Sequence, residues 1–565
     1  MSVRIILAGL ALSLVLGQGA VAQEFTGVWH GTITAPGGQL RVVLKVKPDA
    51  TDGELISVDQ GAVSIPVSGV KIDGARLTFA APRISARYEG AWDAARQGWT
   101  GQWLQGSAMT LNLDKGDLPP GPVLAGLDGQ WRGALTMPSG TKLRLVLNVR
   151  TGAYGTLATF DSPDQLAYGL PVATLTHTGP AVSFVIGGPG GASLGTWEGA
   201  LSADGKTLDG TWVQGATRLP LQLAQGAAPA RAARSQTPKP PLPYRTEEVA
   251  LDSAPGVRLA GTLTAPQGKG PFPAVVMITG SGAQDRDETL LGHKPFLVIA
   301  DALTRRGIAV LRLDDRGVFG STGDFGKAVT ADFAVDAEAA ARYLRGRSDI
   351  DPRRVGLVGH SEGGLIAPMV AAADPKIAFA VLLAPPGAPL GELLAAQRLA
   401  IAPSMGLDLK SAEAMNAAMI AALAAMQGSK DDAEAEARAM TALKTALPGV
   451  PDASITAQAR TYSSNWMRQL LAYDPRPNLR RMRIPVLAVI GSKDQQVVAA
   501  QNLPALREAL KGDAKATVLE LPGLNHLLQT APTGAPGEYA DIEETVAPAA
   551  LTLIADWVVK QTGAR

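Results

Sequence analysis

The sequence contains no cysteine, only five histidines among 565 residues, and no excess of charge of either sign. The absence of cysteine excludes disulfide bonds, a thiol nucleophile and thiolate zinc sites. Because 52 Lys and Arg residues balance 51 Asp and Glu residues, a basic nucleic-acid footprint is not expected. Beyond the N-terminus, no uninterrupted apolar run reaches the roughly 18 residues of a membrane span. We therefore expect no membrane anchor in the mature chain.

Residues 1–22 have the pattern of an export signal. Arg4 provides a positive charge, Ile5–Leu16 is an apolar core, and Ala20–Ala22 is a small-residue cleavage site. An uncleaved anchor is the alternative, but the apolar core is short for a bilayer about 30 Å thick. The pattern predicts cleavage after Ala22 and a periplasmic or extracellular protein.

An internal repeat follows the signal. The sequence FTGVWHG at Phe25–Gly31 returns as LDGQWRG at Leu127–Gly133. Both halves have short apolar runs broken by Gly, Pro and Asp-Gly, which is typical of strands and turns. We expect two copies of a β module, at residues 23–120 and 121–224, each a small barrel or sandwich.

Seven of the nine tryptophans lie in these modules. An exposed indole can stack on a sugar ring, so glycan contact by the modules is one hypothesis. The alternative is that Trp29 and Trp131, and likewise Trp103 and Trp212, recur because they fill equivalent core positions. We favour this packing role.

A change of pattern separates the modules from the rest of the chain. Residues 225–245 contain five prolines and four basic residues but no acid, which predicts a stiff, solvated linker. In residues 246–565, apolar runs alternate with amphipathic helical patterns, as in an α/β domain with helices on both faces of its sheet. The expected strands are Ala274–Thr279, Ala309–Asp314, Val355–Gly359, Ile377–Ala384, Val486–Gly491 and Ala516–Leu521.

The third of these runs ends in GHSEG, at Gly359–Gly363. G-x-S-x-G between a strand and a helix is the nucleophile turn of serine hydrolases, where small flanking residues allow a sharp, strained bend. The pattern predicts Ser361 as a nucleophile that needs a base to take its proton.

The few histidines allow the base to be found by elimination. His30 and His177 belong to the β modules, His293 precedes the nucleophile, and His360 adjoins it. His526 follows the last expected strand, where the base of this chain order belongs. His526 is therefore the predicted base.

The acid that orients the base should follow a strand between the nucleophile and the base. Asp494 follows the strand Val486–Gly491, whereas the alternative, Asp474, precedes it in a Tyr-Asp-Pro segment. We predict that Asp494 is the third member of the triad.

An oxyanion site needs backbone N–H donors. The amide of Glu362, directly after the nucleophile, is one predicted donor. The other is expected from the loop after the first strand, where we choose Ser281, with Gly282 as the alternative. The loop lacks the third glycine of a dinucleotide motif, and no P-loop or zinc-protease motif occurs.

With these residues in place, the chain resembles the serine α/β-hydrolases, specifically the exported bacterial esterases of the EstD type, and is similar to the S9/S33 peptidase-like group. The resemblance covers about residues 247–560. It implies an α/β-hydrolase fold, hydrolysis of a small-molecule carboxylic ester without a cofactor or metal, and the triad Ser361, Asp494 and His526. The motifs that carry the resemblance are Gly280–Asp287, Asp314–Gly317, Ser321–Gly323, Gly359–Gly364, Gly491–Asp494 and Asn525–His526.

Two departures from the family pattern, Leu313 and Phe319, concern loops near the pocket. A Met-bearing, Ala-rich helical segment at about 389–475 interrupts the strand–helix alternation and is expected to form a cap. The charged residues Asp285, Asp287, Asp315 and Arg316 could contact substrate or brace adjacent loops through ion pairs, and we favour the structural role.

Two alternatives remain open for the function. One is an aminopeptidase or dipeptidase on the same triad, with Glu362 or the pair Asp285 and Asp287 receiving a substrate ammonium. The other is a glycan- or cell-wall-binding esterase of the deacetylase type.

Overall fold

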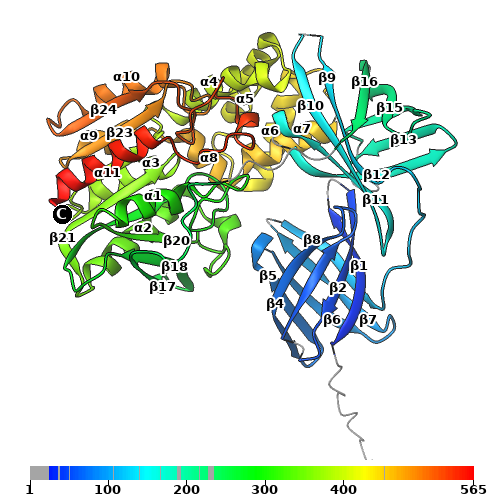
Figure 1. Cartoon of the computed structure of the whole chain (residues 1–565), viewed down its shortest axis with the longest axis horizontal. Coiled ribbons are helices and arrows are strands. Elements are labelled where there is room, and N and C mark those ends of the chain that lie inside the picture. The colour runs from blue at the N-terminus through cyan, green and yellow to red at the C-terminus, as the bar shows by residue number, and fades with distance from the viewer. Residues whose placement is uncertain are drawn as a thin grey trace, which may run out of the picture.

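The computed structural model describes residues 25–564, except 36–37, 50, 85, 106, 139, 166, 188–192, 216, 227–233 and 451. The predicted export signal, residues 1–22, lies outside the described residues. Figure 1 shows two β barrels and a larger α/β domain, with the second barrel beside the helices above that domain's sheet. Among the described helices, none combines the length and the apolar character needed to cross a membrane.

The N-terminal part folds into two closed antiparallel barrels of eight strands each. In the first barrel β1 pairs with both β2 and β8, and in the second β9 pairs with both β10 and β16. The duplicated all-β module expected from the repeat is confirmed. The first barrel comprises β1 (Gly27–Ala35), β2 (Gly38–Val46), β3 (Asp52–Ser57), β4 (Val63–Asp73), β5 (Arg76–Ala81), β6 (Ala86–Asp93), β7 (Gly98–Gln105) and β8 (Ser107–Lys115). The second comprises β9 (Gly129–Thr136), β10 (Lys142–Gly152), β11 (Gly155–Ser162), β12 (Ala167–Thr178), β13 (Ala181–Ile186), β14 (Gly195–Leu201), β15 (Thr207–Gln214) and β16 (Thr217–Gln225).

Tryptophans pack the interiors of both barrels. Trp29 and Trp131 occupy equivalent positions on β1 and β9 and are at most 2% exposed. Of the seven barrel tryptophans only Trp92 is half-buried rather than buried. The described barrels therefore present no fully exposed indole for stacking on a sugar ring.

The second barrel is joined to the α/β domain by polar contacts. Arg144 on β10 donates to the carboxylates of both Asp164, in the same barrel, and Asp541, in the α/β domain. Gln165 Nε2 donates to the backbone oxygen of Met405 in the helical cap. The barrel therefore touches both the cap and the loop region after the last strand.

The linker differs from the solvated spacer expected for residues 225–245. In its described part, Arg234 donates to the backbone oxygens of Leu291 and Ala540, and Gln236 bonds to the backbone of Thr545 and Val546. This segment thus follows the surface of the α/β domain. Its polar side chains form hydrogen bonds with backbone groups of the α/β domain. The composition of the linker alone does not predict these contacts.

The C-terminal domain contains one sheet of eight strands in the order β17-β18-β20-β19-β21-β22-β23-β24. The strands from β20 to β24 along this order run parallel, and they include all six expected strands. The antiparallel hairpin β17–β18 at one edge was not among the expected strands. The bounds are β17 (Arg245–Ala254), β18 (Val257–Ala265), β19 (Phe272–Ile278), β20 (Ala309–Leu313), β21 (Ile350–His360), β22 (Ala380–Leu383), β23 (Val486–Gly491) and β24 (Ala516–Leu521).

Helices cover both faces of this sheet and create two hydrophobic cores. α2, α3, α9 and α10 pack on one face, and α1 and α11 on the other. Between β22 and β23, the helices α4 to α8 form a cap, as expected for residues 389–475. The α/β-hydrolase fold with a helical cap is confirmed. The bounds are α1 (Pro295–Thr304), α2 (Thr330–Arg345), α3 (Gly363–Ala373), α4 (Leu390–Ile401), α5 (Leu409–Met426), α6 (Asp432–Ala446), α7 (Asp452–Ser463), α8 (Asn465–Ala472), α9 (Arg476–Arg481), α10 (Ala499–Leu510) and α11 (Pro548–Thr562).

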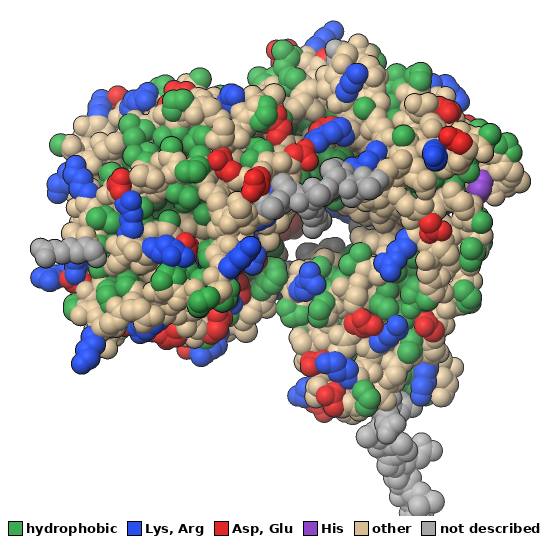
Figure 2. Space-filling model, in the orientation of Figure 1, with side chains coloured by type: hydrophobic (Ala, Val, Ile, Leu, Met, Phe, Trp, Pro, Cys, Tyr) green, Lys and Arg blue, Asp and Glu red, His purple; other side chains and the backbone are tan. Residues whose placement is uncertain are grey.

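The molecular surface reflects the balance of charges in the sequence. Figure 2 shows basic and acidic side chains interspersed over the face in view, with no extended area of one sign.

Candidate active site

The predicted nucleophile lies on a strained turn between β21 and α3. Ser361 has a φ of 53°, a left-handed conformation that costs a non-glycine residue energy. The turn requires glycine on both sides, because a Cβ on Gly359 would lie 2.1 Å from the oxygen of Gly363. A Cβ on Gly363 would lie 2.1 Å from the oxygen of Ile278 on β19. The glycines therefore let the strand and the helix approach closely and present Ser361 at the end of the sheet.

The predicted base and acid are joined by a hydrogen bond. His526 Nδ1 lies 2.9 Å from Asp494 Oδ2, and both side chains are buried. Asp494 Oδ1 accepts the backbone N–H groups of Gln496 and Val497, both at 2.8 Å, which fixes the carboxylate. An ionised carboxylate accepts hydrogen bonds but cannot donate them, so Nδ1 of His526 must carry the proton in this bond. Nε2 is then unprotonated and can act as a base.

Asp494 and His526 are brought together by the close approach of two loops. A Cβ on Gly491, at the end of β23, would lie 2.1 Å from the oxygen of Leu524. The alternative acid, Asp474, lies elsewhere and pairs with Arg476. The structure thus pairs His526 with Asp494 and not with Asp474.

A second buried histidine–carboxylate pair lies behind the nucleophile. His360 Nδ1 is 2.9 Å from Glu288 Oε1, and His360 Nε2 is 3.1 Å from the backbone oxygen of His526. Both partners accept hydrogen bonds, so the imidazole is held with both nitrogens protonated. Burial disfavours this charged ring, but the carboxylate of Glu288, the backbone oxygen of His526 and the charge of Asp494 together raise the pKa of His360 above its ordinary value.

Glu288 also contacts the loop that follows β19. Its Oε1 accepts the backbone N–H of Gly280 at 2.7 Å, and its own backbone is left-handed, with a φ of 53°. Glu288 therefore links the predicted oxyanion loop to His360, which in turn holds the backbone of His526. The sequence analysis missed this residue, since a lone Glu in an acidic loop carries no distinguishing pattern.

Replacing Glu288 with Ala is expected to lower kcat about 100-fold with little change in KM, because displacements of about 1 Å at a catalytic group cost that much. Glu288→Gln keeps an acceptor for Gly280 and should restore part of the rate. The control is Asp285→Ala, which removes a carboxylate of the same loop that bonds Thr289. Steady-state kinetics that show equal losses in Asp285→Ala and Glu288→Ala would assign the effect to the loop as a whole.

The predicted oxyanion donors flank the nucleophile. A Cβ placed on Gly280 would lie 3.2 Å from the Cβ of Ser361, so the loop and the turn are in direct contact. Neither the amide of Ser281 nor that of Glu362 donates a hydrogen bond to another described residue. Ser281 lines the same cavity as Ser361, whereas the alternative, Gly282, does not.

Ser361 and His526 both open onto one cavity of about 280 Å³. We call it the catalytic cavity. Within the described residues Ser361 Oγ makes no hydrogen bond, and such contacts often form only when substrate is bound. The apolar part of the walls comes from the loops of the sheet, from α3 and from the cap helices α4 and α8: Leu290, Leu365, Pro386, Leu390, Leu393, Leu394, Trp466, Met467, Leu470, Val497 and Leu527.

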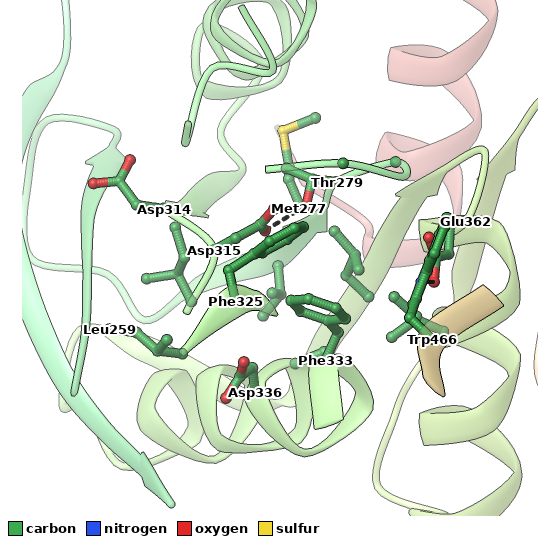
Figure 3. Close-up of a pocket in the computed structure, with 17 residues that line it drawn as sticks. Leu259, Met277, Thr279, Asp314, Asp315, Phe325, Phe333, Asp336, Glu362 and Trp466 are labelled. Atoms are coloured by element: carbon green, nitrogen blue, oxygen red, sulfur yellow. Dashed lines mark hydrogen bonds between the residues drawn. The ribbon is translucent and has the colours of Figure 1, made fainter. Parts of the chain in front are cut away.

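A smaller cavity of about 50 Å³ adjoins the catalytic cavity, and we call it the inner cavity. Gly280, Glu362 and Trp466 line both. Figure 3 shows Glu362 beside Trp466 on one side of the inner cavity, and Asp315, with its hydrogen bond to Thr279, nearer its middle. Glu362 Oε1 accepts from Trp466 Nε1 at 3.2 Å, so this carboxylate reaches the cap.

Asp315 has no cationic partner among the described residues. Its oxygens accept from Thr279 Oγ1 at 2.7 Å and from the backbone N–H of Gln284 at 2.9 Å. Burial, aided by the negative charges of Glu288 and Asp336, raises the pKa of Asp315 to about 8. The carboxyl is thus held neutral below that pH and does not form the ion pair expected from the sequence.

The pKa of Asp315 predicts a pH-dependent stability difference. Between the ordinary pKa of 3.8 and about 8, the folded chain keeps a proton that the unfolded chain releases. The free energy of unfolding therefore falls as pH rises through this range, by at most about 1.4 kcal/mol per pH unit. Asp315→Asn lacks this titrating group, so its free energy of unfolding should not show this decline. The stability of the variant relative to the wild type should therefore increase as pH rises.

Thermal unfolding of both proteins at several pH values across the range from about 4 to 8 measures the effect. A difference between wild type and Asp315→Asn that stays constant with pH would contradict it. The matched control is Asp314→Asn, in the neighbouring position, whose carboxylate is already paired with Arg286.

The other charged loop residues act as braces. Asp287 pairs with Lys294 and Arg312, and Arg316 pairs with Asp336. These pairs connect the loops at the ends of β19 and β20 with α1 and α2. They agree with the structural role predicted for Asp287 and Arg316.

Among the described residues, no group of three or more His, Asp or Glu side chains is arranged to hold a metal ion.

Comparison with known proteins gives three sequence matches of interest. Residues 255–522 match the family model of X-Pro dipeptidyl-peptidase (S15 family). Esterase EstD of Thermotoga maritima is 31% identical over 304 residues, which cover 54% of this chain and 66% of that protein. The putative hydrolase YtaP of Bacillus subtilis is 33% identical over 129 residues, covering 20% of this chain and 43% of that protein. The chain thus spans just under two thirds of the length of EstD.

Solved structures with similar folds include an esterase from Pyrococcus furiosus, at 14% identity and a TM-score of 0.37. The similarity covers 59% of this chain and 99% of the esterase. Est1E from Butyrivibrio proteoclasticus with bound ferulic acid is 17% identical, with a TM-score of 0.33, covering 55% and 96% of the two chains.

Proposed function

We propose that the C-terminal domain is an EstD-type esterase of the serine α/β-hydrolases, which it resembles in sequence, and that it hydrolyses carboxylic esters through an acyl-enzyme on Ser361. The observation that carries the proposal is the shared opening of Ser361 and the His526–Asp494 pair onto one cavity. The apolar walls suit an acyl group of small or medium size.

In the proposed mechanism, His526 Nε2 takes the proton of Ser361 Oγ as that oxygen attacks the ester carbonyl. The amides of Ser281 and Glu362 bind the oxyanion, and Asp494 stabilises the imidazolium. His526 then returns the proton to the departing alcohol. Water, deprotonated by the same His526, attacks the acyl-enzyme and releases the acid and Ser361.

Initial rates on p-nitrophenyl esters from acetate to palmitate test the proposal. Turnover with an optimum at short or medium chains is expected from the size of the catalytic cavity. Failure to hydrolyse any ester of the series would overturn the assignment. Export to the periplasm or medium stays a proposal, which fractionation of the producing cells tests.

Peptide or aminoacyl substrates are a second candidate, favoured by the inner cavity. The carboxylate of Glu362, which lines both this cavity and the catalytic cavity, has no cationic partner among the described residues and accepts only from Thr330 and Trp466. A substrate ammonium would supply the missing positive charge beside Ser361. Aminoacyl p-nitroanilides, assayed alongside the esters, decide between the two: anilide turnover with little ester turnover would identify a peptidase.

A further inference from the structure

A third hollow, which we call the cap groove, lies in the cap beside the catalytic cavity. It has a volume of about 400 Å³ and shares Leu394, Gln397 and Met467 with the catalytic cavity. The two hollows therefore adjoin along α4, on which Leu394 and Gln397 lie. The remaining residues that line the groove are Arg398, Ile401, Ala402, Met405, Leu407, Met419, Gln458, Thr461 and Tyr462.

Arg398 is the one charged residue of the cap groove. Every partner of its guanidinium among the described residues is neutral: Asn416 Oδ1, Tyr462 OH at 3.1 Å, and Met419 Sδ at 3.9 Å. These three partners are at most 8% exposed, so they hold the guanidinium in one place. A fixed arginine without an acidic partner, in an otherwise uncharged hollow, favours binding of an anion.

The geometry of α4 sets where that anion would lie. Leu394 and Arg398 are four residues apart and project from the same face of the helix. They are separated by about 6 Å along its axis. Leu394 belongs to both hollows, whereas Arg398 belongs to the cap groove alone. The positive charge is thus reached only by a substrate that extends beyond the catalytic cavity.

We propose that the cap groove binds the distal end of an ester substrate that carries a carboxylate, with Arg398 as its partner and the apolar walls around an intervening chain. The inference rests on the proposed function and adds a substrate class to it. The carboxylate can belong to the acyl part, as in a monoester of a dicarboxylic acid, or to the alcohol part, as in an ester of a hydroxy acid.

Two series of esters test the proposal. The first compares p-nitrophenyl monoesters of succinic, adipic and suberic acids with p-nitrophenyl alkanoates of equal length. The second compares acetyl esters of hydroxy acids with acetyl esters of the matching alcohols. We expect one series to show a higher kcat/KM for the anionic member at a preferred length. Which series shows it tells whether the carboxylate lies on the acyl or the alcohol side.

In Arg398→Gln the ratio of anionic to neutral kcat/KM should fall about 10- to 100-fold, the worth of a hydrogen bond to a charged group. Arg398→Lys keeps the charge and should retain part of the ratio. The matched control is Arg460→Gln on α7, which removes an arginine that pairs with Glu436 and lines neither hollow. If the ratio of anionic to neutral kcat/KM is unchanged in Arg398→Gln, then Arg398 only connects cap helices and the proposal is overturned.

Calorimetric titration of suberate into the Ser361→Ala protein separates this proposal from the proposed function. We expect salt-sensitive binding that is lost when Arg398→Gln is added. If wild type hydrolyses no ester, the proposed function fails, yet the titration still decides whether the groove binds a carboxylate. The wild type could instead hydrolyse esters with no preference for the anionic member of either series, while suberate does not bind. That result would leave the proposed function intact and overturn the proposal that the cap groove binds a carboxylate.

Discussion

Replacing Ser361 with Ala is expected to reduce kcat on p-nitrophenyl esters about 10⁶-fold, the loss seen when a triad serine is removed from a serine hydrolase. The hydroxyl is the only group at the strained turn that can form the acyl-enzyme. The turn itself should survive, because its geometry depends on the flanking glycines Gly359 and Gly363 rather than on the hydroxyl. Alanine also accepts a φ of 53° no less readily than serine does.

Burst and steady-state measurements on the same ester check this prediction. Ser183→Ala, which removes a hydroxyl that bonds Thr176 in the second barrel, serves as the control for an ordinary serine substitution. If Ser361→Ala keeps more than a small fraction of the wild-type kcat while Ser183→Ala behaves normally, the nucleophile lies elsewhere.

Replacing Asp494 with Asn is expected to lower kcat about 10⁴-fold. The amide would present a donor to Nδ1 of His526 and favour the tautomer with the proton on Nε2. His526 could then no longer accept the proton of Ser361. Substrate binding should change little, because Asp494 is buried behind His526 and does not line the catalytic cavity.

Asp474→Asn provides the matched control, since Asp474 was the other candidate acid in the sequence. Its carboxylate pairs with Arg476 and lies outside both hollows. Its kcat should equal that of the wild type. A larger loss in Asp474→Asn than in Asp494→Asn would reverse the assignment of the acid.

Most of the strands that carry the site, such as β23, could be predicted because they are buried on both faces. The edge strand β24 is only partly buried, but its mostly apolar run still marks it. Runs such as Val486–Gly491 and Ala516–Leu521 match β23 and β24 in both bounds. The edge hairpin β17–β18 was not predicted, because β17 has one exposed face and reads as a mixture of polar and apolar residues. The course of the linker could not be predicted either, since it depends on backbone groups of the folded α/β domain.

The triad candidates could be located because a strained turn, a chain order and a shortage of histidines each restrict the choice. The pairing of Glu288 with His360 could not, because it joins residues far apart in sequence through one carboxylate that also binds Gly280. Asp315 was expected in an ion pair, but the sequence does not show that no cationic side chain reaches it in the folded chain, where it is half-buried. Long-range packing decides both points.

The most direct test of the central claim is the intact mass of the protein after brief exposure to an alkyl fluorophosphonate, followed by peptide mapping. Such a reagent phosphonylates an activated serine and mimics the tetrahedral intermediate. The account predicts one adduct per chain, on the peptide that contains Ser361, with activity lost in proportion and no adduct in Ser361→Ala. An adduct on another residue, or full activity in a protein labelled at Ser361, would contradict it.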